Sequence, residues 1–144
     1  MSPAANIGIG LKCNMANSEW QMASGKPHQR LELWQQAMLL VKEIYAVTAS
    51  FPREEMFGLV SQMRRAAVSI PSNIAEGAAR EGDKEYAHFL SIARGSLSEL
   101  DTQVQIAVML NYLAADHPLH GLLDRVGKLL SGLSKKLKSD VAKK

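Results

Sequence analysis

The stretch RRAAVSIPSNIAEGAAR, from Arg64 to Arg80, decides how the chain is interpreted. It has a helical pattern on both sides of Pro71, a residue that lacks a backbone N–H and crowds the carbonyl four positions earlier, at a cost of about 3 kcal/mol inside a helix. Ser69 and Ser72 flank the proline, and their hydroxyl groups can bond backbone groups near such a defect. The stretch therefore predicts one long helix with a kink at Pro71.

A row of polar residues runs along one side of this helix. Its members are three or four positions apart and so share one helix face: they are Gln62, Arg65, Ser69, Asn73, Glu76 and Arg80. The next predicted helix carries a second polar row, which consists of Ser91, Arg94, Ser98, Thr102 and Gln105. The two rows could face each other inside the bundle or between subunits, with Gly95 allowing close approach. Three interpretations stay open: a solvated face, a buried polar network or subunit contact, and a catalytic site.

The segment before this stretch predicts a first helix over about residues 28–50. It has two adjacent apolar faces. One face consists of Leu31, Trp34, Met38, Val41 and Tyr45. The other consists of Leu33, Ala37, Leu40, Ile44 and Val47. An apolar arc this wide indicates burial on two sides.

The remaining segments complete a four-helix pattern. Phe51-Pro52 ends the first helix, and the second is expected over about 53–79, with acidic residues in its first turn. The third is expected over about 83–113 with Asp83 as its N-cap, and the fourth from about 119 to 139 with a narrow apolar stripe. No long strand pattern is present, since the sequence has no β-branched alternation bounded by Asn-Gly or Asp-Gly turns. The sequence therefore predicts an all-α fold, an antiparallel up-down-up-down four-helix bundle.

The two ends of the chain differ from this middle part. Prolines and glycines punctuate residues 1–27, which we expect to form a disordered or flexible leader before a bundle over 28–139 and a flexible basic tail over 140–144. Residues 125–144 contain seven basic residues and one acidic residue, a net charge of +6, whereas residues 1–124 have a net charge of −3. A basic end can attract phosphates or complement a helix dipole, and both interpretations stay open.

Catalytic and nucleotide-binding motifs are missing from the sequence. It has no GxxxxGK[ST] loop and no GxGxxG after a strand. Glu85 and His88 have the Glu-x-x-His spacing of di-iron bundles, but no second copy lies on another helix. Glu76 and Glu99 are the candidates for a catalytic carboxylate pair, and no histidine is in register with them. We therefore predict that the protein is not an enzyme and has no cofactor.

The remaining signals concern metals and location. Asp116, His117 and His120 could bind a metal, but Pro118 and the loop setting favour a surface turn. The single Cys13 cannot form an intramolecular disulfide, which fits a reducing cytoplasm. No apolar run approaches the roughly 20 residues of a membrane span. We expect no metal site, no membrane partner and a cytoplasmic protein.

Three segments carry a resemblance to a known family. They are LELWQQAMLLVKEIY (31–45), FPREEMFGLVSQMRRAAVSIPSNIAEGAAR (51–80) and EYAHFLSIARGSLSEL (85–100). Together they resemble the four-helix bundle proteins named for 23S rRNA intervening sequences, and SIPSNIAEG (69–77) with RGSLSEL (94–100) are the most specific parts. The resemblance covers about residues 28–115 and leaves out the leader and the basic tail.

The resemblance implies a bacterial homopentamer, a ring of bundles without enzymatic activity. The family is similar to the accessory proteins of diversity-generating retroelements, which form such rings and bind nucleic acid and reverse transcriptase. The family name records gene location and does not establish ribosome membership. The family's motif residues are expected to determine fold and assembly; they match Gln62, Arg65, Ser69, Pro71, Asn73, Glu76, Gly77, Arg80, Gly95, Ser96 and Glu99.

From these observations we expect an oligomeric, non-enzymatic bundle that binds RNA or DNA, or scaffolds a protein partner that does. Binding would be mainly to phosphates, because no sequence-reading motif is present. The expected nucleic-acid contacts are Arg64, Arg125, Lys128, Lys135, Lys136 and Lys138. The alternative is a structural or protein-interaction module without nucleic-acid affinity. An enzyme that uses Glu76 and Glu99 is the third hypothesis.

Overall fold

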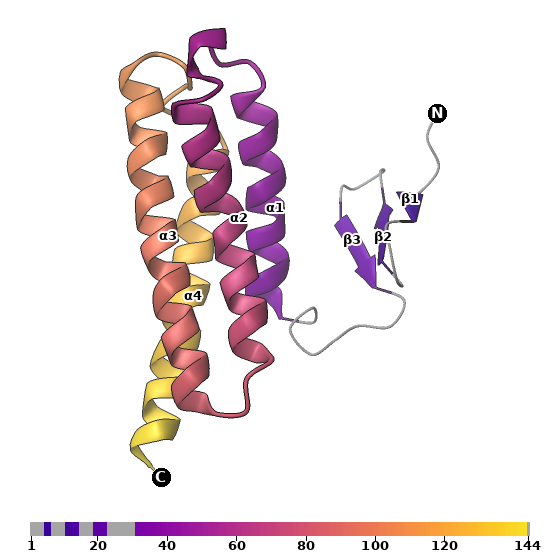
Figure 1. Cartoon of the computed structure of the whole chain (residues 1–144), viewed down its shortest axis with the longest axis vertical. Coiled ribbons are helices and arrows are strands. Elements are labelled where there is room, and N and C mark those ends of the chain that lie inside the picture. Colours follow the sequence, from indigo (N-terminus) through magenta and orange to yellow (C-terminus); the bar gives the residue numbers. More distant parts are fainter. Residues whose placement is uncertain (1–4, 7–10, 15–18, 23–30, 144) are drawn as a thin grey trace.

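The computed structural model describes residues 5–6, 11–14, 19–22 and 31–143, and in it four helices pack against one another (Figure 1). They are α1 (Glu32–Thr48), α2 (Leu59–Ala78), α3 (Asp83–Met109) and α4 (Leu119–Ala142). A short 3-10 helix, η2 (Arg53–Glu55), lies between α1 and α2. Figure 1 shows the α1–α2 and α3–α4 connections at one end of the bundle and the α2–α3 connection at the other. The predicted four-helix bundle is confirmed.

Three short strands lie in the N-terminal part of the chain. β1 (Ala5–Asn6), β2 (Leu11–Asn14) and β3 (Glu19–Met22) form an antiparallel sheet in the order β1-β2-β3. The sequence pattern predicted no strands here, because strands of two to four residues are too short to display period-two alternation. The rest of residues 1–27 lies outside the described part, and the flexible leader stays a prediction.

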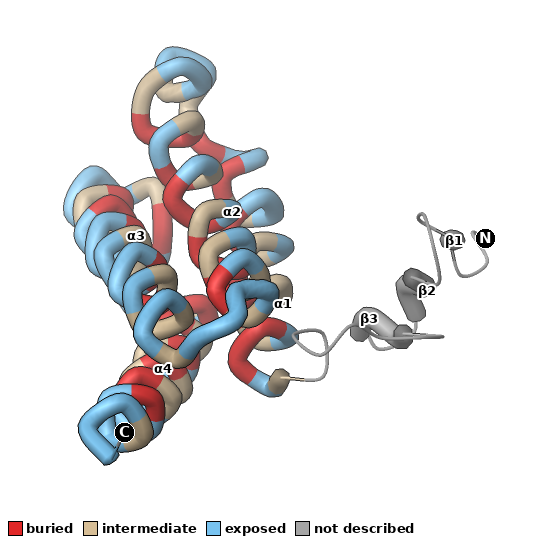
Figure 2. Tube along the Cα trace, turned by 60° about the horizontal axis from the view of Figure 1, so that its bottom comes forward, coloured by how far each residue is buried: buried red, intermediate tan, exposed pale blue. Residues whose placement is uncertain are grey.

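The core is built from the sides of the helices that face one another, where buried positions gather (Figure 2). Its largest completely buried side chains are Leu40, Ile44, Met63, Ile70, Ile74, Leu90, Leu100, Val104 and Val126. Burial of one such side chain is worth roughly 1.5–3 kcal/mol. Every helix contributes to this single cluster, which explains why four separate amphipathic segments fold as one unit.

The two apolar faces of α1 have different environments. Leu33, Ala37, Leu40 and Ile44 are buried in the core. On the other face, Trp34 is buried, Met38 and Val41 are half-buried and Tyr45 is exposed. Within this chain, burial on two sides is therefore only partly achieved, and an apolar surface remains along α1.

Several helix ends differ from the sequence prediction. The second predicted helix starts later than Arg53, because η2 and a turn precede α2, where a Glu55 Oε2 accepts the Leu59 N–H at 3.2 Å. Asp83 is the first residue of α3, and Gly82 occupies the N-cap position. The fourth helix continues to Ala142, three residues beyond its predicted end.

The α3 helix ends earlier than predicted, at a Schellman motif. Asn111 has a positive φ of 62°. The Tyr112 N–H donates to the Ala107 carbonyl at 2.8 Å, and the Asn111 N–H donates to the Val108 carbonyl at 3.0 Å. These are the two bonds of that motif, and asparagine tolerates the left-handed conformation that it requires.

Candidate functional site

The region around Pro71 is a continuous part of α2 in which polar side chains bond the backbone. Pro71 is buried within the helix. The Ser72 hydroxyl donates to the Val68 carbonyl at 2.8 Å, and Asn73 Nδ2 donates to the Ser69 carbonyl at 2.8 Å. The expectation that side chains bond the backbone here is thus confirmed for Ser72, and Asn73 makes the second bond in place of the Ser69 hydroxyl.

The Ser69 hydroxyl instead joins α2 to α3. Its Oγ lies 2.8 Å from Ser96 Oγ and also accepts a hydrogen bond from Asn73 Nδ2 at 3.0 Å. All three residues are half-buried. This seam, formed by Ser69, Asn73 and Ser96, is a small polar network between two helices, where each pairing in a partly desolvated setting is worth about 1 kcal/mol.

The seam uses a different side of α3 from the one that the sequence indicated. The predicted polar row of α3 is exposed and does not face the α2 row; its members are Ser91, Arg94, Ser98, Thr102 and Gln105. Ser96 and Gln103, which are seven residues apart and so share one face, lie on the more buried side. Within one chain the two rows therefore do not face each other, because the densest polar spacing is typical of the solvent-exposed side of a helix. A contact between the rows of different subunits stays a prediction.

Gln103 is a buried polar residue that sequence reasoning missed. Its side chain is 5% exposed, Nε2 donates to Glu99 Oε1 at 3.2 Å, and Oε1 has no partner among the described residues. A buried, unpaired amide oxygen costs about 1–3 kcal/mol. No signal in the sequence separates Gln103 from the exposed polar residues beside it.

The helices α2 and α3 pack closely at Gly77. A Cβ added there would lie 2.9 Å from Phe89 Cβ, 3.0 Å from Tyr86 Cδ1 and 3.3 Å from the Tyr86 carbonyl oxygen. Burial in this contact raises the pKa of the Tyr86 phenol. Gly95 is different, because it is exposed and a Cβ there would meet nothing within 4 Å. Within this chain, Gly95 therefore does not allow the close approach of the two helices, and Gly77 does. Close approach at Gly95 between subunits stays a prediction.

The outer motif residues are accessible to solvent. Gln62, Arg65, Glu76, Arg80 and Glu99 are exposed. An Arg80 Nη2 lies 2.9 Å from Glu76 Oε1, and its guanidinium carbon lies 5.0 Å from the Phe89 ring centre. Exposed pairs of this kind contribute about 0–1 kcal/mol.

The two carboxylates proposed as a catalytic pair are not brought together. Glu76 adjoins Gly77 and so lies near the level of Phe89, whereas Glu99 is ten residues further along α3, about 15 Å away along the axis. Glu76 pairs with Arg80, and Glu99 accepts a bond from Gln103.

Asn73 and Glu76 belong to the same polar row of α2, but their alanine substitutions are expected to differ in their effect on stability. Asn73→Ala removes two hydrogen bonds from a half-buried seam and should lower the free energy of unfolding by about 1 kcal/mol. Glu76→Ala removes an exposed pair and should change it by less than about 0.5 kcal/mol. Urea denaturation of both variants is the measurement, and equal destabilisation would contradict the assignment of the seam.

The six expected nucleic-acid contacts divide into engaged and unengaged cations. An Arg64 Nε donates to Thr48 Oγ1 at 3.0 Å, and its guanidinium lies 4.5 Å from the Tyr45 ring centre. Two further cations are paired: Arg125 with Glu32 at 2.8 Å, and Lys128 with Asp124 at 3.1 Å. The other three, Lys135, Lys136 and Lys138, are exposed and have no ion pair within the described part of the chain. We call these three the basic end of α4.

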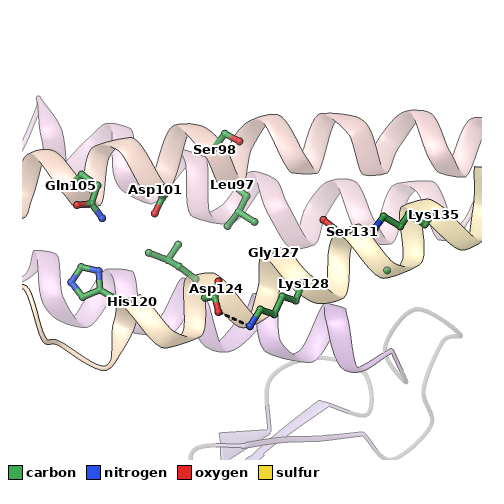
Figure 3. Close-up of a pocket in the computed structure, with 12 residues that line it drawn as sticks. Leu97, Ser98, Asp101, Gln105, His120, Asp124, Gly127, Lys128, Ser131 and Lys135 are labelled. Atoms are coloured by element: carbon green, nitrogen blue, oxygen red, sulfur yellow. Dashed lines mark ion pairs between the residues drawn. The ribbon is translucent and has the colours of Figure 1, made fainter.

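A groove runs between α3 and α4 next to the basic end (Figure 3). It has a volume of about 730 Å³, and Asp101 and Asp124 line it together with Lys128 and Lys135. The close-up shows Lys128 directed toward Asp124 (Figure 3). The acidic and basic residues of the groove balance, so it offers no net attraction for an anion.

The histidines of the α3–α4 connection have structural roles. His117 Nδ1 accepts the Leu119 N–H at 3.0 Å, which satisfies a free donor at the start of α4. His120 Nε2 lies 3.1 Å from the Ala114 carbonyl oxygen. Among the residues that the structure describes, no group of three or more His, Cys, Asp or Glu side chains is placed to hold a metal ion.

An apolar surface covers the outer side of α1 and α2. Two hollows lie along it and share Val68, which is 42% exposed. The first, of about 580 Å³, adjoins the turn before α2 and includes Tyr45, Met56 and Phe57. The second, of about 400 Å³, is lined by Trp34, Met38, Val41, Val68, Pro71, Ser72 and Ala75. We call the second one the apolar hollow.

Comparison with known proteins gives a family and a fold. The model of the family described as 23S rRNA-intervening sequence protein matches residues 29–132. A solved structure of a protein of unknown function from the S23 ribosomal protein family of Bacteroides thetaiotaomicron VPI-5482 is similar, with a TM-score of 0.55 and 16% identity. The alignment covers 76% of this chain and 97% of that one. No curated protein matches this chain. Within the described residues, no helix is both long enough and apolar enough to cross a membrane.

Proposed function

Because this chain belongs to the 23S rRNA-intervening sequence protein family, we propose that it is a non-enzymatic, cytoplasmic four-helix bundle that assembles with its own copies and binds RNA or DNA through phosphate contacts. The observation that carries the nucleic-acid part is the basic end of α4. Its three lysines are exposed and have no ion pair with any described residue, whereas the other three expected contacts are engaged within the chain.

The chemistry of α4 favours phosphates over bases as the bound groups. The helix contains no Phe, Tyr or Trp, so it has no platform on which a base could stack. Lysine ammonium groups bind phosphates and displace the counterions of the nucleic acid. This contribution to the binding free energy does not depend on the base sequence. We therefore expect weak sequence preference and strong salt dependence.

The self-assembly part of the proposal is supported by the apolar surface of α1 and α2. Contiguous exposed apolar surface on a water-soluble domain marks an interaction site. The resemblance to the family leads us to expect a ring of five copies, each an antiparallel up-down-up-down bundle with a bend at Pro71. In such a ring, the half-buried face of α1 would gain the second partner that its sequence indicates.

The alternative function is a protein scaffold without nucleic-acid affinity. The charge-balanced groove between α3 and α4 favours it, because a groove of this kind suits a polypeptide better than a polyanion. An enzyme is less well supported, since Glu76 and Glu99 lie apart.

Light scattering of the purified protein, with and without a generic RNA, at low and at high salt, tests the proposal. A pentamer that gains mass with RNA only at low salt is the expected result. A pentamer that ignores RNA at every salt concentration would favour the protein scaffold. A monomer would reject self-assembly. The gain of mass with RNA at low salt would still test nucleic-acid binding by the monomer.

A further inference from the structure

The turn between η2 and α2 carries an unusual apolar projection. Phe57 is 96% exposed and its neighbour Met56 is 50% exposed. A single exposed apolar side chain is ordinary, but two adjacent large ones on a turn at the edge of an apolar surface are not. We call Met56 and Phe57 the tip.

The apolar hollow is a matching recess on the same side of the molecule. Trp34, Met38 and Val41 of α1 form one wall, and Val68, Pro71 and Ala75 of α2 form the other. Most of these groups are hydrocarbon, so water in the hollow is poorly satisfied and an inserted apolar side chain would displace it favourably.

One chain cannot fill its own hollow with its own tip. From Leu59 at the start of α2 to Pro71 in the hollow there are twelve residues of helix, about 18 Å along the axis. The tip is held at the far end of that length by the turn and by the bond from the Leu59 N–H to Glu55. Within one chain the tip therefore cannot enter the hollow, and only the tip of another copy could do so.

We propose that the tip of one copy docks in the apolar hollow of a second copy; this rests on the self-assembly part of the proposed function and specifies its contact. Charge supports a second copy as the occupant. Glu54, beside the tip, is exposed, and Lys42, directly after Val41 of the hollow, is also exposed. Neither has an ion pair among the described residues. Docking would bring Glu54 of one copy near Lys42 of the other.

The tip and the hollow are different patches of one surface, so each copy can give its tip to one neighbour and its hollow to another. Contacts between unlike patches generate closed rings when the rotation between copies closes. A self-associating ring therefore needs no further interface to explain its assembly.

The test uses two exposed positions and two matched controls. Phe57→Ser removes the more exposed side chain of the tip, and Val68→Lys places a charge at the mouth of the hollow. Met109→Ser and Ile92→Lys are the controls, since Met109 is 72% exposed and Ile92, at 40%, matches the 42% of Val68. Light scattering should give the single-chain mass of 15.8 kDa for each test variant, while both controls keep the wild-type mass.

A mixture of the two test variants makes the experiment specific. Phe57→Ser copies keep an intact hollow, and Val68→Lys copies keep an intact tip. An equimolar mixture should therefore form a complex of two chains, although each variant alone is monomeric. Circular dichroism of each variant checks that the helices persist. A charge swap gives a further check: Glu54→Lys or Lys42→Glu alone should lower the mass of the assembly, and the two changes combined in one chain should restore it.

The possible outcomes separate this contact from the broader proposal. If the wild type assembles and the two test variants keep its mass, the docking contact is overturned and self-assembly stands. If the wild type is monomeric, both self-assembly and the docking contact are overturned. The basic end lies on α4, away from the tip and the hollow. Its affinity for RNA therefore tests the nucleic-acid part of the proposed function independently of self-assembly.

Discussion

Replacing Lys135, Lys136 and Lys138 together with glutamine is expected to weaken binding of a generic RNA by on the order of 10²-fold at about 0.1 M salt. Each phosphate contact contributes about 0.7–0.9 to the slope of log affinity against log salt, so the slope should fall by roughly 2–3. The three side chains are exposed, so the fold should be unaffected. Fluorescence anisotropy with labelled RNA across a salt series measures both quantities.

The matched control removes cations that are already paired. In Arg125→Gln combined with Lys128→Gln, the lost charges were neutralised by Glu32 and Asp124. The loss of affinity per removed charge should therefore be clearly smaller than at the basic end. An equal loss per charge would mean that RNA responds only to net charge, and no loss in the triple variant would reject the basic end as the binding site.

Gly77→Ala is expected to lower the free energy of unfolding by about 1–2 kcal/mol. The new methyl group would meet Phe89 Cβ and the Tyr86 ring at 2.9 and 3.0 Å, and Phe89 Cβ, unlike the end of a flexible side chain, cannot move aside cheaply. Overpacking of this kind costs about 1–3 kcal/mol, while the helix preference of alanine returns at most about 1 kcal/mol. Thermal unfolding should show a midpoint lower by roughly 4 °C per kcal/mol.

Gly132→Ala is the control for this substitution. Gly132 lies within α4 and is exposed, and a Cβ there would meet nothing within 4 Å. The same chemical change should therefore raise stability by about 0.5–1 kcal/mol. If the two substitutions change the free energy of unfolding in opposite directions, the loss in Gly77→Ala comes from the α2–α3 contact. If Gly77→Ala were neutral or stabilising, the helices would not be packed as closely there as the structure describes.

The parts of the fold that depend on repeated spacing could be predicted from the sequence. Each helix buries a stripe of apolar residues, and a stripe repeated over several turns stands out even in one sequence. The end of α3 depends on a single residue instead. Asn111 was a usable signal for a left-handed helix end, but apolar residues on both sides of it continued the helical pattern.

The candidate site was less predictable, because its pairings depend on the rotation of one helix against another. Spacing placed Ser69 and Asn73 on one face but could not choose between the two sides of α3. The same limit applies to the lysines. The sequence shows the charge of Arg125 and Lys128, but only the packing of α1 against α4 and the turns of α4 show that Glu32 and Asp124 neutralise them.

The short connection between α2 and α3 has a kinetic consequence. Only four residues, 79–82, separate the two helices, and the contacts at Gly77 with Phe89 and at Ser69 with Ser96 join positions much closer in the chain than the contact of Arg125 with Glu32 between α4 and α1. Closing so small a loop costs little entropy, so this hairpin can form before α1 and α4 dock on it. We expect its amide hydrogens to be the last to exchange with deuterium, and substitutions in the α2–α3 contact to give the highest φ-values of the bundle.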